Sequence, residues 1–448
     1  MRKDRNYQQL NQQKSLLLPF GKLNQKMKKI FLAIVWCFVI AVQAQDFNQY
    51  FEHKTLRLDY VFGGNNQEQF ILLDELSSYP LWAGRTHHLN QNVLRGNGQV
   101  RVFDKITDKL IYTTSFSTLF QEWLSTDEAV KGNKSFENVF LVPFPKDKVK
   151  IELVLFDRDG KEKNKVVHEI NPKDILIHRK GIKDITDYEY VQQATDHTKA
   201  INVVFVAEGF TKSEMDKFMD AVKISIEQIL QHKPFDRYAN NFNFIAVKSE
   251  SSDSGVSVPR TGDWRKTAVE SNFDTFYSER YLTTNRIKKL HDILAGIPYE
   301  HIIILANTDV YGGGGIYNSY TLTTTGHKDF KPVVVHEFGH SFAGLADEYF
   351  YSNDVLSDFI SIRSEPWEKN ITTLVDFDSK WKNRLKKDTP VPTPEKDADK
   401  YKIGVYEGLK GEKIYKATLD CRMKTNQYPE FCPVCQNAIE DLILFYTE

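Results

Sequence analysis

The sequence predicts a protein of the α+β or α/β class, in which a β-sandwich-like domain precedes an α/β domain. Three observations lead to this prediction. The chain has 448 residues, more than one hydrophobic core usually serves. Short segments of alternating polar and apolar residues fill the first part, and strand-like and helix-like segments alternate in the second. We therefore expect domains at residues 45–185 and 195–448, joined by a polar linker at residues 184–200.

The first domain is predicted from short segments with a period of two residues. Turn sequences rich in glycine, asparagine and aspartate separate them, and few helical patterns interrupt them. The clearest strand candidates are residues 55–62, 99–106, 109–116 and 149–156.

The second domain begins with a continuous apolar strand at residues 200–210. An amphipathic helix follows, and Thr211 and Glu214 have the spacing of a capping box at its start. Further strands are expected at residues 241–250 and 301–308, and further helices at residues 283–296 and 434–448. The charged, proline-bearing stretch at residues 378–400 is expected to be a solvated excursion.

The N-terminal segment has the pattern of a secretory leader. Residues 27–44 read MKKIFLAIVWCFVIAVQA, with two lysines, an apolar core and small residues before a cut after Ala44. The apolar core is shorter than the roughly 20 residues of a membrane span. We expect Met27 to be the true start, so that residues 1–26 are not translated, and the mature chain to be periplasmic, surface-bound or secreted. Cys37 lacks the preceding small residues of a lipid-bearing cysteine.

Composition excludes several classes of partner. Lys and Arg number 59 and Asp and Glu number 60. So nearly neutral a chain has no electrostatic basis for binding nucleic acid or an anionic membrane. We expect neither a nucleic-acid partner nor a membrane span in the mature chain. We expect the protein to be a monomer.

The remaining cysteines lie close together near the C-terminus, at Cys421, Cys432 and Cys435. In an exported protein this spacing favours a local disulfide with one thiol left over. Three cysteines without a nearby histidine cannot complete a four-ligand zinc site unless another part of the chain supplies a ligand.

The segment His336-Glu337-Phe338-Gly339-His340 fits the H-E-x-x-H pattern. On a helix, residues four apart face the same way, so both imidazoles can bind one zinc ion. Glu337 would lie beside them and accept a proton from a zinc-bound water. The alternative is a helix that carries two histidines by coincidence.

The candidates for the third zinc ligand are narrowed by elimination. No histidine follows His340, and Gly344 is expected to end the helix. In the pattern H-E-x-x-H-x-x-G-x-x-H the third ligand comes three residues after the glycine, which here is Asp347. Glu348 is the runner-up. The other candidates are His327 upstream and the later glutamates Glu365, Glu368 and Glu407.

The segment HEFGHSFAGLADEY resembles the active-site segment of the bacterial IgA-peptidase family of zinc metallopeptidases. VVFVAEGFTKSEM, FNFIAVKSESSDSGVSVP, YGGGGIYNSYTL, SEPWEKNIT and the C-terminal cysteine segment are also similar, and together they cover most of residues 201–435. The β-rich region before them is similar to the accessory domain of that family.

The resemblance implies a metzincin-like zinc peptidase with His336 and His340 as ligands, Glu337 as general base and Asp347 as third ligand. The sequence departs from the metzincin pattern, because one extra residue separates His340 from Gly344 and aspartate replaces histidine.

The resemblance also implies that Met423 forms the methionine turn beneath the metal, the alternative being an ordinary buried methionine. Tyr428 is a candidate for stabilising the oxyanion.

The glycine-rich segment at residues 311–324 has no Gly-Lys-Ser/Thr and so does not fit a phosphate loop. We interpret it as an edge strand to which a peptide substrate adds through Gly314, Gly315, Ile316 and Tyr317. A flexible loop is the alternative.

These observations lead to two functional hypotheses. The first is a secreted zinc endopeptidase whose partner is a protein or peptide substrate and whose cofactor is Zn²⁺. The second is an exported binding or adhesion module with a structural metal, which the β-rich domain favours. His87 and His88 are expected to be surface residues.

Overall fold

The computed structural model describes residues 46–349, 361–408 and 413–448, and residues 47–448 form one compact unit. The expected leader at residues 27–44 and the preceding residues 1–26 lie outside the described residues. Within the described part of the chain, no helix has the length and apolar character needed to cross a membrane.

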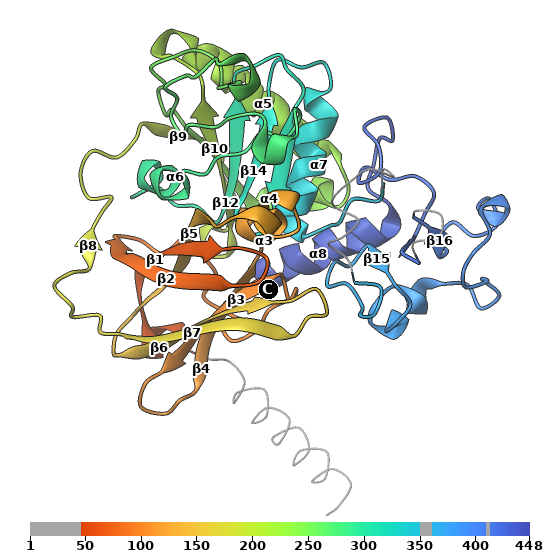
Figure 1. Ribbon diagram of the computed structural model, residues 1–448, viewed down its shortest axis with the longest axis horizontal. Coiled ribbons are helices and arrows are strands. Elements are labelled where there is room, and N and C mark those ends of the chain that lie inside the picture. The colour runs from red at the N-terminus through yellow and green to blue at the C-terminus, as the bar shows by residue number, and fades with distance from the viewer. Residues whose placement is uncertain (1–45, 350–360, 409–412) are drawn as a thin grey trace, which may run out of the picture. The chain divides into compact units, whose positions relative to one another are not determined.

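The first eight strands form two four-stranded sheets, ordered β5-β1-β2-β8 and β4-β3-β6-β7. All their pairings are antiparallel except that of β2 with β8. Figure 1 draws these strands in red to yellow. Aromatic rings join the sheets: Phe116 on β4 lies 4.2 Å from Phe140 on β5, between ring centroids. The bounds are β1 Phe51–Gly64, β2 Gln69–Tyr79, β3 Gly98–Asp104, β4 Leu110–Phe116, β5 Lys134–Pro145, β6 Val149–Phe156, β7 Glu162–Ile170, β8 His178–Arg179, α2 Phe47–Tyr50, α3 Leu119–Trp123 and α4 Asp127–Lys131.

A six-stranded sheet follows, in the order β13-β14-β12-β10-β11-β9. Its four inner strands are parallel, and the two edge strands run antiparallel to their neighbours. Part of the expected linker at residues 184–200 forms strand β9, so this segment belongs to the sheet. Its polar sequence does not predict that it pairs with β11. The bounds are β9 Tyr188–Gln192, β10 Ile201–Glu208, β11 Phe242–Val247, β12 His301–Ala306, β13 Gly313–Ile316 and β14 Tyr320–Thr324.

The two faces of this sheet belong to different apolar cores. Val204 and Ile304 are buried in the core that also contains residues of the N-terminal sheets. Phe205 and Leu305 are buried in a second core with residues of α5, α7 and α8. Because strand side chains alternate between faces, continuous apolar strands such as β10 bury both. The sheet is therefore covered on both sides.

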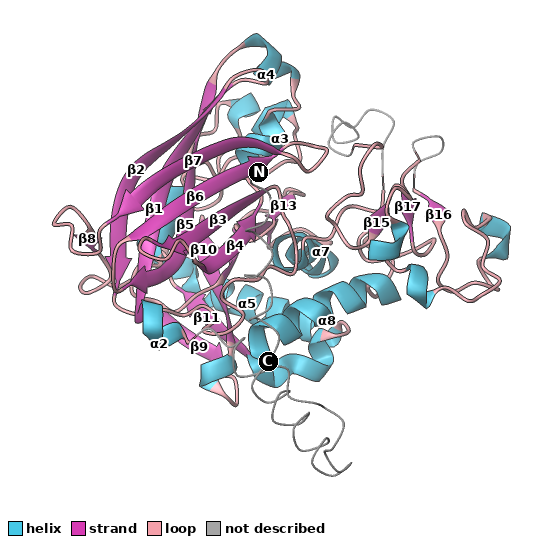
Figure 2. Ribbon diagram, turned by 90° about the horizontal axis from the view of Figure 1, so that it is seen from below, coloured by secondary structure: helices cyan, strands magenta, loops and turns pink. Residues whose placement is uncertain are grey.

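Three helices cover the second face: α5 Met215–Gln231, α7 Phe330–Ala343 and α8 Pro433–Thr447. The predicted capping box of Thr211 and Glu214 is confirmed just before α5. Figure 2 shows α7 nearly end-on, beside β13 and next to α8. Helix α7 therefore lies between the glycine-rich edge strand and the C-terminal helix.

A buried arginine joins the N-terminal sheets to helix α6 (Ile287–Ile293). Arg57 on β1 donates to Asp59 at 2.6 Å and to Asp292 on α6 at 2.6 Å. Arg57 and Asp59 are almost fully buried. The guanidinium thus holds the two regions together.

The C-terminal region adds a small antiparallel sheet, ordered β15-β17-β16. Its strands are β15 Ile371–Thr372, β16 Tyr406–Glu407 and β17 Tyr415–Lys416. The charged stretch at residues 378–400 is not entirely solvated. Trp381 is buried and donates its indole N–H to the carbonyl of Gly404 at 2.8 Å, which anchors the stretch.

Candidate metal centre

Helix α7 places the two imidazoles of the H-E-x-x-H segment together. The Nε2 atoms of His336 and His340 are 3.1 Å apart, and both side chains are largely buried. The helix ends at Gly344 as predicted, with φ of 56° in the left-handed region that favours glycine. A Cβ atom on Gly344 would also lie 2.4 Å from the Trp367 ring. The bend therefore needs glycine for two reasons.

Asp347 follows that bend and returns to the imidazoles. Its Oδ1 atom lies 3.1 Å from Nε2 of His336 and 3.2 Å from Nε2 of His340. This places Asp347, rather than Glu348, in the predicted third position. The three donor atoms lie within 4.8 Å of one another.

Backbone carbonyls fix the orientation of both rings. Nδ1 of His336 is 2.9 Å from the carbonyl oxygen of Arg422, and Nδ1 of His340 is 2.5 Å from that of Leu345. A ring that donates from Nδ1 directs the lone pair of Nε2 outward. Both lone pairs therefore face the point that Oδ1 of Asp347 also faces.

This donor set fits a divalent cation. Burial lowers the pKa of His340, but the charge of Asp347 outweighs burial and raises that pKa to about 9. Burial raises the pKa of Asp347, but the two histidines outweigh it and hold that pKa well below its usual range. The cluster thus attracts positive charge to its centre. Two imidazole nitrogens and a carboxylate oxygen are ligands that catalytic zinc takes, with a further position left for solvent or substrate.

Glu337 lies beside this cluster on the same helix. Burial raises the pKa of its carboxyl group, and the charge of Asp347 adds to this effect. A Cβ atom on Gly313 of β13 would lie 3.1 Å from Oε1 of Glu337. The carboxylate therefore points toward the edge strand rather than into the core.

The glycines of β13 allow that strand to approach α7. A Cβ atom on Gly315 would lie 2.2 Å from the carbonyl oxygen of Glu337 and 2.8 Å from Cβ of His340. No side chain fits at this position. The close packing of strand β13 against helix α7 therefore depends on glycine at residue 315.

The edge strand lies one residue earlier than the predicted substrate edge at residues 314–317. Strand β13 ends at Ile316, which is buried. Tyr317 is also buried, and its carbonyl accepts a hydrogen bond from the N–H of Ser117 at 3.0 Å. An isolated bridge also joins Tyr281 to Gly313 on the outer side. The N-terminal region thus covers the end of the edge that the sequence left open.

Met423, the predicted methionine-turn residue, packs against helix α7. It is fully buried, and its sulfur would lie 2.9 Å from a Cβ atom on Gly339, the residue that precedes His340. Its carbonyl oxygen accepts a hydrogen bond from the N–H of Glu348 at 2.9 Å. Tyr428 is 40% exposed, and no described contact joins it to the donor set.

The other candidate ligands have different partners. Glu348 turns away from the histidines and accepts a hydrogen bond from Asn370 at 3.1 Å. His327 packs its ring against Tyr311. His87 and His88 contact Phe445 on α8, so His87 is only half-exposed. The remaining candidates lie outside the described donor set of His336, His340 and Asp347, namely Glu365, Glu368 and Glu407.

The expected disulfide among the C-terminal cysteines is not formed. Cys421, Cys432 and Cys435 are free thiols, and all three are buried. They gather around Glu348, which the sequence separates from them by more than 70 residues. This distance along the chain explains why sequence analysis paired the cysteines only with one another.

The sequence also gave no indication of Glu122 as a neighbour of the site. This residue lies on α3 in the N-terminal region, and the Tyr281 hydroxyl donates to its carboxylate. Burial raises the pKa of Glu122 to about 7, and the charges of His340, Asp347 and Glu337 also act on it. The accessory region therefore contributes an ionisable group to the surroundings of the metal centre.

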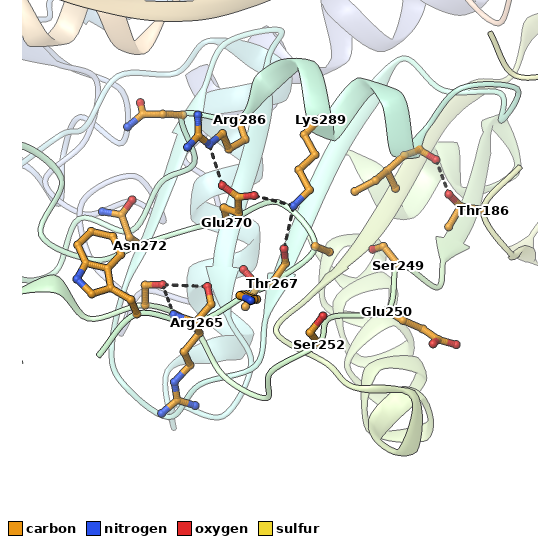
Figure 3. Close-up of a pocket in the computed structure, with 16 residues that line it drawn as sticks. Thr186, Ser249, Glu250, Ser252, Arg265, Thr267, Glu270, Asn272, Arg286 and Lys289 are labelled. Carbon is orange, nitrogen blue, oxygen red and sulfur yellow. Dashed lines mark hydrogen bonds and ion pairs between the residues drawn. The ribbon is translucent and has the colours of Figure 1, made fainter. Parts of the chain in front are cut away.

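A large pocket lies elsewhere. Its volume is about 990 Å³, and its lining residues include none of the donor set. Figure 3 shows Glu270 accepting from Arg286 at 2.8 Å and from Lys289 at 2.9 Å on its wall. These ion pairs neutralise the Glu270 carboxylate. We therefore place the candidate site at the donor cluster, where ionisable groups converge, and not in this pocket.

Two family models match the chain. The model described as IgA Peptidase M64 matches residues 190–403, which include α7 and Asp347. The model described as Peptidase M64 N-terminus matches residues 46–167, which contain the first six strands and most of β7. No curated protein matches the chain. The two matches are adjacent, in the order accessory region then peptidase region, and together they span most of the sequence. The chain belongs to the IgA peptidase M64 family.

Proposed function

We propose that the protein is an exported, zinc-dependent endopeptidase. One observation supports this above all: three donor atoms from His336, His340 and Asp347 converge beside the carboxylate of Glu337. Family membership makes a peptidase the coarser conclusion. The donor set supports zinc, and the leader-like residues 27–44 support export.

Each residue of the centre has a separate task. When bound, zinc supplies a Lewis acid that lowers the pKa of a water molecule and polarises the substrate carbonyl. His336 and His340 are held in register by the carbonyl groups of Arg422 and Leu345, so little reorganisation is needed for binding. Glu337 accepts a proton from the attacking water and passes it to the leaving amine, which returns the carboxylate to its starting state.

We also propose that the arrangement around the metal is metzincin-like. The left-handed bend at Gly344, the donor that follows it and the methionine beneath the helix support this assignment. An extra residue in the last turn, with aspartate as the third ligand, would distinguish this centre from the three-histidine pattern. The shorter aspartate side chain reaches both imidazoles because the chain turns sharply at residue 344.

The test separates metal binding from proton transfer. Glu337→Gln keeps the shape of the side chain and removes the base, so it should retain zinc while kcat/KM falls by about 10²–10⁴-fold. Glu227→Gln changes an exposed glutamate on α5 and is the matched control. Cleavage of a broad peptide library is measured with and without a chelator, alongside zinc content.

Two outcomes would contradict the proposal. Full cleavage by the Glu337→Gln variant would remove the assigned base. A zinc-loaded wild-type protein that cleaves no peptide in the library would instead support a binding module with a structural metal. Asp347→Ala should lower zinc content at the donor set, and unchanged content would exclude Asp347 as a ligand.

A further inference from the structure

A second cluster of metal-binding side chains lies beyond the proposed catalytic centre. It consists of Glu348, Cys421, Cys432 and Cys435, whose donor atoms lie within 4.8 Å of one another. All four residues are at most 2% exposed. Cys432 and Cys435 lie at the start of α8, and Cys421 precedes Cys432 by 11 residues. The cluster is fully enclosed by protein.

The spacing of the sulfur atoms fits a tetrahedral ion. Sγ of Cys421 lies 3.7 Å from Sγ of Cys435. A disulfide would need about 2.05 Å. Two thiolates bound to one zinc at 2.3 Å in a tetrahedron are about 3.8 Å apart. The observed separation is therefore that of two ligands of a shared cation.

The surroundings of the cluster stabilise negative charge on sulfur. The backbone N–H of Cys432 points at Sγ of Cys421 at 3.1 Å, and that of Met423 at 3.5 Å. The N–H of Cys435 points at Sγ of Cys432 at 3.5 Å, at the N-terminus of α8. Such donors favour the thiolate, which is the form that binds metal.

Glu348 supplies the carboxylate that the cysteines lack. Its Oε1 atom is 3.2 Å from Sγ of Cys435, and Oε2 has no hydrogen-bond partner among the described residues. The nearby Lys416 ammonium donates to the backbone carbonyl of Glu348, at 3.2 Å, in place of the carboxylate. A buried carboxylate with one unsatisfied oxygen is costly unless a cation binds it.

We propose that Glu348, Cys421, Cys432 and Cys435 form a second zinc site, which is structural. Three thiolates and one carboxylate fill all four positions, so no position is left for solvent or substrate. The site is independent of the proposed catalytic function, because none of its ligands belongs to the first donor set.

This site would hold in place two backbone segments that contribute to the catalytic centre. Glu348 directly follows Asp347, so an ion on Glu348 fixes the segment that carries the third donor. Cys421 directly precedes Arg422, whose carbonyl orients His336. A single buried ion would thus hold, through the backbone, a donor and an orienting group of the other site.

The experiment counts metal in the mature chain, residues 45–448, with zinc as the probe. The wild-type protein should hold two zinc ions per chain. The double variant His336→Ala/His340→Ala should hold one, and cobalt in that variant should give the near-ultraviolet absorption of thiolate ligands. Adding Cys435→Ser to the double variant should abolish that absorption and the remaining ion.

Thiol counting excludes the competing arrangement. Cys37 lies in the expected leader, so the mature chain has three cysteines, and denatured protein with chelator and no reductant should show three free thiols. One free thiol would indicate a disulfide and overturn the proposal. One zinc in the wild type and none in the double variant would also overturn it, even if the Cys435→Ser protein fails to fold. Absence of cleavage by wild-type protein that holds two ions would contradict only the catalytic proposal.

Discussion

The variant Gly315→Ala tests how strand β13 positions helix α7, which carries His336, Glu337 and His340. The new methyl group would lie 2.2 Å from the carbonyl oxygen of Glu337, where ordinary contacts begin at 3.4 Å. Backbone atoms on both sides cannot swing away, so strand β13 and helix α7 must separate by roughly 1 Å. Overpacking of this kind costs about 1–3 kcal/mol of stability. A displacement of ~1 Å in a catalytic group costs about 100-fold in rate.

We therefore expect Gly315→Ala to lower kcat/KM by about 100-fold and Tm by roughly 2–6 °C. The assay combines cleavage of a quenched fluorescent peptide, thermal unfolding and zinc content. Gly132→Ala is the matched control, because a Cβ atom there meets nothing within 4 Å and the backbone is extended. Its kcat/KM and Tm should not fall.

Gly313→Ala provides an intermediate case. Its Cβ atom would lie 3.1 Å from Oε1 of Glu337, the mobile end of a side chain. Activity should fall while zinc content is unchanged and Tm changes less than in Gly315→Ala. Unaltered kcat/KM and Tm in Gly315→Ala would refute the packing argument. A lower Tm with full activity would show that the strand moves and the helix does not.

Two further predictions concern buried charge. Arg57→Met should lower the free energy of unfolding, measured in urea, by about 3–5 kcal/mol, because it leaves Asp59 buried without its partner. The control Lys54→Met breaks an exposed pair with Glu52 and should cost less than about 1 kcal/mol. Equal losses in the two variants would contradict this reasoning. Burial lowers the pKa of His301 to about 3. Below pH ~6.5 the unfolded chain therefore binds a proton that the folded chain does not, and the free energy of unfolding decreases as the pH is lowered. Between pH 7 and pH 5 the wild type should lose about 2 kcal/mol more than His301→Gln, and parallel losses would exclude His301 as the cause.

The local features of the metal helix were predictable because they depend on neighbouring residues. A four-residue spacing places His336 and His340 on one helix face whatever surrounds the helix. Gly344 ends the helix because its left-handed conformation is a local preference, and counting three residues onward reaches Asp347. The capping box before α5 is local in the same sense.

Features that depend on distant segments were not predictable in this way. The polar sequence of β9 gives no sign that β11 offers it a partner, so it was interpreted as a linker. The burial of Tyr317 depends on Ser117, 200 residues earlier in the chain. Such contacts are set by the path of the chain, which a single sequence does not reveal.

The sequence by itself therefore determined the two imidazoles, the adjacent glutamate and the carboxylate after the bend, because helical periodicity and one glycine encode their spacing. Only the tertiary structure decided that Glu348 belongs with the three cysteines and that Glu122 lies near the donor set. The physical reason is that apolar burial drives the packing of α7, α8 and the N-terminal sheets without direction. Which polar side chains then meet in the interior follows from that packing as a whole.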